Sequence, residues 1–108
     1  MNNQNITFIH TVFFWFIENP TQAQIAAFVK DVNTLGTIPG VVTFFSGPPA
    51  GTPRDVVDNS YGYAINVHFK SKEDHDIYQD HPIHHEFIKN QAFFWTKVQV
   101  YDLSLIHI

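Results

Sequence analysis

Residues 6–17 constrain the fold more than any other stretch of the chain. They read ITFIHTVFFWFI, contain neither Gly nor Pro, and are mostly β-branched or aromatic, which is typical of a β-strand. Successive side chains of a strand point to opposite faces of its sheet, and both alternating phases of this stretch are apolar. We therefore expect a strand here whose sheet is covered on both faces.

The segment after this strand predicts an amphipathic helix that ends at Gly36. Asn19 offers a cap acceptor, Pro20 suits the first helical position, and Gln22 follows three residues after the cap, as at many helix starts. Apolar residues then recur at helical spacing: Ile25, Phe28, Val29, Val32 and Leu35. The helix should bury this face against the sheet.

Two further strands and a long loop are expected next. After the turn Ile38-Pro39-Gly40, residues 41–45 predict a short strand, and residues 47–59, with three Pro and two Gly, predict a loop. A loop of this length is either functional or an exposed hairpin connection. Residues 60–70 alternate between two faces. One face carries Tyr61, Tyr63, Ile65, Val67 and Phe69, and the other carries Gly62, Ala64, Asn66 and His68.

The rest of the chain predicts two helical segments and a last strand. Residues 71–74, Ser-Lys-Glu-Asp, resemble a capping box that starts a helix running to about Asp80. Pro82 cannot sit inside that helix, so it opens a new segment at 82–90, and residues 93–108 form the closing strand. The order βαββαβ over one domain, residues 1–108, predicts an α+β, ferredoxin-like fold with a four-stranded antiparallel sheet. Its helix-free face is apolar, so an identical copy should cover it, giving a homodimer.

Composition excludes several classes of function. A formal net charge of -4 without a basic stripe argues against a nucleic-acid partner. The absence of Cys excludes thiol catalysis and thiolate metal sites. No apolar run is long enough to cross a membrane, and Met1–Asn5 does not begin like a secretory leader. A cytoplasmic location is the expectation.

Candidate chemistry is concentrated at residues 78–87, YQDHPIHHEF. A helix broken at Pro82 directs side chains of both pieces toward one point, so Tyr78 and His84 are expected to face the same cavity. His10 lies in the apolar phase of the first strand and, taken alone, has the pattern of a core histidine. His68 belongs to the small-residue face as a structural residue, His75 is expected in solvent, and His107 supports no inference.

A metal site is the remaining alternative for this segment. His81 and His85 lie four residues apart, as do Asp80 and His84, a spacing that lets two side chains on one helix face share an ion. A third ligand and an HExxH order are both lacking. No metal or cofactor is therefore predicted.

Four stretches resemble the stress-responsive A/B barrel (Dabb) domain family. They are His10 with the strand 12–16, Ile38-Pro39-Gly40-Val41, Gly62-Tyr63, and residues 78–87 with their His-Pro-x-His core. The resemblance implies a dimeric ferredoxin-like α/β barrel. Family members include stress proteins without an assigned reaction and a polyketide cyclase, olivetolic acid cyclase.

The resemblance also implies roles for individual residues. By analogy with the cyclase, His84 would be a general base, Tyr78 would bind a carbonyl or enolate oxygen, and His10 would orient the substrate or a partner ring. The cyclase has a further histidine on the strand that corresponds to residues 60–70, where this chain has Ile65.

Two hypotheses follow from the residues and the resemblance. The first is a small lyase or cyclase-like enzyme that acts on an apolar, polyketide-like carbonyl compound. Its pocket would be lined by residues of the helix-facing side: Phe14, Phe28, Tyr63, Ile65 and Phe87. The second is a non-catalytic stress-response or ligand-binding dimer. An open cavity beside Tyr78 and His84 favours the first, and a filled core favours the second.

Overall fold

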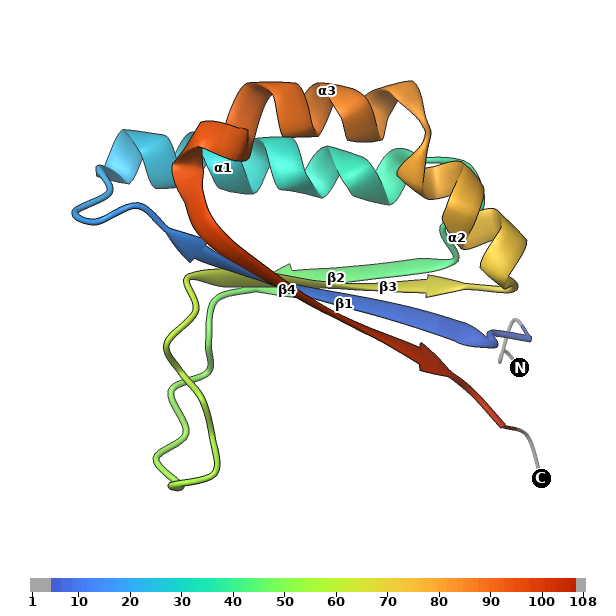
Figure 1. The fold of residues 1–108 in the computed structure, drawn as a ribbon, viewed down its shortest axis with the longest axis horizontal. Coiled ribbons are helices and arrows are strands. Elements are labelled where there is room, and N and C mark those ends of the chain that lie inside the picture. Colours follow the sequence, from blue (N-terminus) through green and yellow to red (C-terminus); the bar gives the residue numbers. More distant parts are fainter. Residues whose placement is uncertain (1–4, 107–108) are drawn as a thin grey trace.

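Residues 5–106 are described by a computed structural model with one sheet and one helical layer. The strands run in the order β2-β3-β1-β4, and every neighbouring pair is antiparallel. All the helices lie on one side of the sheet (Figure 1), so the ferredoxin-like prediction is confirmed. The elements are β1 (Phe8–Phe16), α1 (Gln22–Asn33), η1 (Thr34–Thr37), β2 (Thr43–Gly47), β3 (Tyr63–Phe69), α2 (Lys72–Gln79), α3 (Pro82–Gln91), η2 (Ala92–Phe94) and β4 (Trp95–Ser104).

The predicted boundaries need correction at several places. Strands were expected at 6–17, 41–45, 60–70 and 93–108, whereas those described are shorter or shifted. The last strand begins only at Trp95, because Ala92–Phe94 form a 3-10 turn that buries Phe94. Residues 107–108 lie outside the described range.

The first helix begins and ends differently from the prediction. Its N-cap is Thr21, which exchanges capping-box hydrogen bonds with Gln24, while Asn19 lies before the helix with a positive φ of 54°. The helix does not end at Gly36 but passes into η1 after Asn33. A Cβ on Gly36 would lie 3.0 Å from the Phe44 ring, so this glycine permits close packing of η1 on β2.

The helix-covered face of the sheet holds the core. Burial alternates along β3 and β1 as the predicted strand pattern requires. The core residues include Val12, Phe14, Phe28, Val32, Leu35, Ile65, Val67, Phe69, Tyr78, Phe87 and Phe94. Tyr61 was expected on this face, but it precedes β3 and its ring lies 4.9 Å from that of Phe13 on the opposite face.

The opposite face of the sheet is uncovered in the single chain and strongly apolar. Phe45, Tyr101 and Leu103 expose 59%, 62% and 55% of their surfaces. Asn66 and His68 lie among them, hydrogen-bonded to each other at 2.6 Å. The loop of residues 48–62 extends past this face, away from the helices (Figure 1).

Candidate functional site

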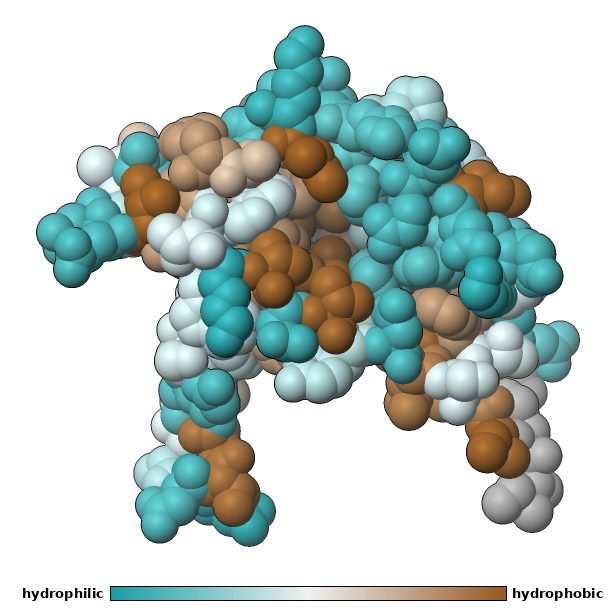
Figure 2. Space-filling model, viewed as in Figure 1, coloured by the Kyte–Doolittle hydropathy of each residue, from teal (hydrophilic) through white to brown (hydrophobic). Residues whose placement is uncertain are grey.

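A cavity of about 170 Å³ lies between the helices and the sheet. Its lining is His10, Val12, Phe14, Leu35, Ile65, Tyr78, Gln79, His84, Phe87, Ile88, Trp95, Val98 and Val100. Ile88, Val98 and Val100 are also 41%, 39% and 42% exposed, so the cavity opens beside the edge strand β4. Figure 2 shows apolar side chains gathered over β4 beneath a mostly hydrophilic helical layer.

Tyr78 and His84 meet in this cavity from the two sides of the helix break. Tyr78 is in the last turn of α2, and His84 is in the first turn of α3. Between them, His81 caps α3 by accepting a hydrogen bond from the Ile83 amide, and Pro82 occupies the first turn. The two rings lie edge to face, 5.1 Å apart. Within residues 5–106, the Tyr78 hydroxyl and the His84 Nδ1 atom are buried and have no hydrogen-bond partner.

Burial gives this pair a definite protonation state. It raises the pKa of the Tyr78 phenol, so the hydroxyl remains a hydrogen-bond donor at neutral pH. Burial, assisted by the neighbouring His10, His85 and His75, lowers the pKa of His84 to about 4. The site therefore holds a neutral acid beside a neutral base.

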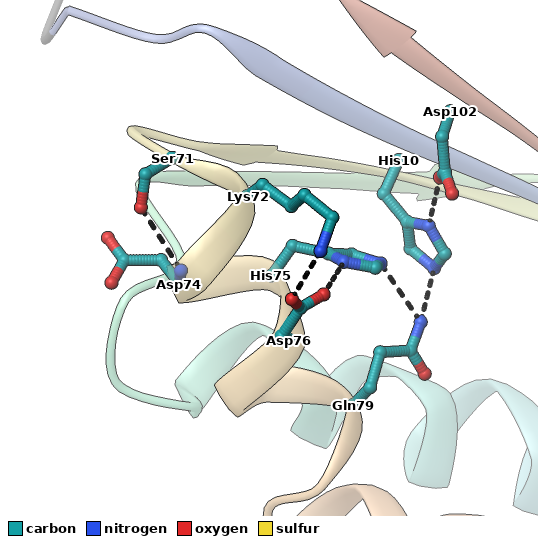
Figure 3. A network of polar contacts seen from close by, with 8 residues as sticks. All are labelled: His10, Ser71, Lys72, Asp74, His75, Asp76, Gln79 and Asp102. Carbon is teal, nitrogen blue, oxygen red and sulfur yellow. Dashed lines mark hydrogen bonds and ion pairs between the residues drawn. The ribbon is translucent and has the colours of Figure 1, made fainter.

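His10 lies in a hydrogen-bonded chain next to this pair (Figure 3). The β1–β4 register places it opposite Asp102, and its Nδ1 lies 2.6 Å from an Asp102 carboxylate oxygen. The Gln79 amide nitrogen lies 3.4 Å from Nε2 of His10 and 3.2 Å from Nε2 of His75. Burial lowers the pKa of His10, although Asp102 opposes this effect.

The predicted lining residues fall into two groups. Phe14, Ile65 and Phe87 line the cavity. Phe28 and Tyr63 lie away from it, because Phe28 is fully buried among aromatic rings and the Tyr63 hydroxyl contacts the Ser46 hydroxyl at 3.0 Å.

The prediction that His75 lies in solvent is wrong. Its side chain is only 12% exposed and stacks on Phe8, with ring centroids 4.4 Å apart. Its Nδ1 lies 3.1 Å from Asp76. The predicted placement of His68, on the uncovered face, agrees with the β3 register.

Within the described residues, His81 and His85 do not form a metal-binding group, although they lie four residues apart. His81 is occupied as a helix cap, and His85 pairs with Asp80 at the surface, 3.1 Å away. The group of possible ligands within residues 5–106 is instead His10, His75 and Asp102, with one ligand atom from each within 4.8 Å of the others.

Sequence reasoning missed Asp102, Gln79 and His75 as parts of the site. Asp102 was visible as a charge within the apolar run of the last strand. Gln79 and His75 lie four residues apart, a spacing that places two side chains on one helix face. His10 and Asp102 are 92 residues apart in sequence, so only the strand register reveals their contact.

Comparison with known families agrees with this geometry. Residues 8–105 match the model of the Dabb family, which is described as "Stress responsive A/B Barrel Domain". The chain belongs to this Dabb family. No curated protein sequence matches it.

Solved structures share the fold across nearly the whole chain. A hydroxynitrile lyase from Passiflora edulis has a TM-score of 0.80 at 20% identity, covering 96% of this chain and 97% of that one. A dimeric ferredoxin-like protein of unknown function from Thermobifida fusca has a TM-score of 0.78 at 19% identity, covering 97% and 96%. A Dabb protein from Mesorhizobium loti has a TM-score of 0.77 at 21% identity, covering 94% and 99%. The TM-scores show that these proteins share the fold of this chain, and at such low sequence identities the likeness extends to the fold alone.

None of the helices within residues 5–106 is both long and apolar enough to span a bilayer.

Proposed function

We propose that this Dabb domain binds a small apolar carbonyl compound in the cavity and transforms it by acid–base chemistry of the lyase or cyclase type. The supporting observation is the buried, unpartnered pair of the Tyr78 hydroxyl and His84 Nδ1 beside an otherwise apolar cavity. Buried polar groups in proteins nearly always have partners. A ligand with a hydrogen-bond acceptor and an acidic proton would supply both.

The protonation states suggest how such a reaction would proceed. Tyr78 donates a hydrogen bond to the carbonyl oxygen and stabilises the negative charge that develops there. His84 accepts the proton, as a neutral imidazole. Because its pKa is about 4, His84 is a weak base and requires a strongly activated proton. A carbon between two carbonyl groups, as in a polyketide, meets this requirement.

The remaining lining residues support the choice of an apolar substrate. Phe14, Phe87 and Trp95 present aromatic rings to the cavity, and its exposed rim is aliphatic. Asp102 holds the His10 ring at the polar end, where it would orient the substrate. The same fold carries a lyase in P. edulis.

The alternative is a non-catalytic dimer that binds the same kind of ligand. The cavity serves binding and catalysis equally well, so only turnover separates the two. Aromatic ketones and 1,3-diketones are suitable probes in a thermal-shift assay. We expect ligands that stabilise the wild type to lose most of that effect in His84→Ala and Tyr78→Phe.

The control for this assay is His85→Ala, because His85 is a surface histidine one residue away. It should retain the full ligand-induced shift. If the ligand-induced shift is unchanged in both His84→Ala and Tyr78→Phe, neither residue of the pair contacts the ligand, which would contradict the proposal. Enolisation of a bound diketone distinguishes the enzyme from the binding domain. It can be monitored as exchange of the acidic hydrogen of the diketone for deuterium.

We also propose that two copies of the chain pack their uncovered sheet faces together. Apolar side chains dominate this face, and exposed apolar patches of this kind mark interaction surfaces. Similar structures from T. fusca and other organisms are described as dimeric. Light scattering after size exclusion should give a dimer for the wild type and for the helix-surface control Lys89→Glu, and a monomer for Tyr101→Glu. A wild-type monomer at micromolar concentration would contradict the proposal.

A further inference from the structure

Two imidazoles converge on a single atom beside the cavity. Figure 3 shows His10 and His75 on either side of the Gln79 side chain, whose amide nitrogen lies 3.4 and 3.2 Å from their Nε2 atoms. An amide nitrogen only donates hydrogen bonds, so both Nε2 atoms direct lone pairs to the same point. Three elements supply these residues, because His10 lies on β1, Asp102 on β4 and the other two on α2.

Each imidazole is held from its other nitrogen by a carboxylate. Nδ1 of His10 lies 2.6 Å from Asp102, and Nδ1 of His75 lies 3.1 Å from Asp76. A carboxylate acceptor fixes the proton on Nδ1 and leaves Nε2 as a free ligand atom, the arrangement found around histidines that bind metals. Asp76 also binds Lys72 at 2.7 Å.

We propose that His10 and His75 bind a divalent transition-metal ion through their Nε2 atoms. Neutral imidazole is a ligand suited to Zn²⁺, Cu²⁺ and Ni²⁺. Rotation of the Gln79 amide by half a turn would exchange its nitrogen for its oxygen and supply a third ligand. Asp102 holds His10 in orientation, and its negative charge favours a cation at this point.

The position of the site allows an ion to enter. The His75 and Asp102 side chains are 12% and 40% exposed, so the cluster lies at the rim of the core. Zn–N bonds are about 2.0–2.1 Å long, so the Gln79 side chain must move as the two rings close on the ion. Stacking of His75 on Phe8 keeps its ring plane in place.

Zn²⁺ titration of the full chain by calorimetry tests this site. The wild type should bind one ion per chain with a saturable isotherm. His75→Phe retains an aromatic ring to stack on Phe8 but lacks both nitrogens, and it should weaken binding at least about tenfold. His85→Phe is the matched control, because His85 belongs to the exposed pair with Asp80, and it should bind as the wild type does.

A spectroscopic measurement locates the ion independently of affinity. In long-range ¹H–¹⁵N spectra, Zn²⁺ should shift the Nε2 resonances of His10 and His75 and leave that of His68 unchanged. The proposal is overturned if the wild type shows no saturable binding, or if His75→Phe binds Zn²⁺ as tightly as the wild type. The same holds if His85→Phe alone loses the ion, since the site would then lie on α3. Ligand binding in the cavity is measured without metal, so the two proposals fail separately.

Discussion

The two ends of the helix-covered core are packed differently. At one end, Phe28 is fully buried, and its ring centroid lies 5.2 and 5.0 Å from those of Phe14 and Phe16. At the other end, Tyr78 and His84 flank a cavity and leave polar atoms without partners among the described residues. Aromatic side chains pack the first end of the core closely. A shortage of large side chains therefore does not explain the cavity at the second end.

The two ends meet at shared rings. Phe14 and Phe87 contact Phe28 on one side and line the cavity on the other. The packed end therefore provides a rigid wall for the cavity, because close-packed rings transmit strain and resist displacement. Stability should depend on the first end and ligand binding on the second.

The largest effect is expected from Phe28→Ala at the packed end. Truncating a fully buried Phe typically costs about 3–5 kcal/mol of the free energy of unfolding. Urea denaturation should show this loss, and Phe28→Leu should show a smaller one. In Phe28→Leu, the ligand-induced thermal shift should persist. A loss of that shift without a loss of stability would indicate that Phe28 belongs to the binding site, as the sequence predicted.

A smaller effect of opposite sign is expected from Tyr78→Phe at the cavity end. The hydroxyl has no protein partner within residues 5–106, so its removal breaks no hydrogen bond in the protein. The free energy of unfolding without ligand should stay the same or rise by about 1 kcal/mol. Urea denaturation measures this change. A decrease of similar size would show that the hydroxyl is engaged in the free protein.

Much of the fold was predictable because local patterns and the tertiary structure agree. Both phases of residues 6–17 are apolar, and β1 is one of the two central strands of the sheet, paired with β3 on one side and β4 on the other. Pro82 divides the second helical region where the structure divides it. Helix and strand ends were less predictable, since Thr21 and Asn19 are both good cap residues and only the path of the chain selects between them.

The candidate site was predictable only in part. Tyr78, His84 and His10 were proposed from their pattern and the resemblance, and the structure places all three around one cavity. Phe28 and Tyr63 share the correct face but lie beyond the cavity, because periodicity gives the face and not the position along it. The contact of His10 with Asp102 depends on the β1–β4 register, which no local pattern specifies.

The smallest expected effect is the pH dependence contributed by His84. Its pKa is about 4 in the folded protein and about 6.5 when unfolded, so between these values the unfolded chain binds more protons. The free energy of unfolding should therefore fall as pH decreases from about 6.5 toward 4. Partial solvent access should keep the change modest. The pKa of His10 is lowered as well, so the wild type should be compared with His84→Gln, which retains His10. Between pH 7 and pH 5, His84→Gln should lose less of its free energy of unfolding than the wild type. Equal losses in both proteins would indicate that His84 keeps an ordinary pKa and that the cavity around it is well hydrated.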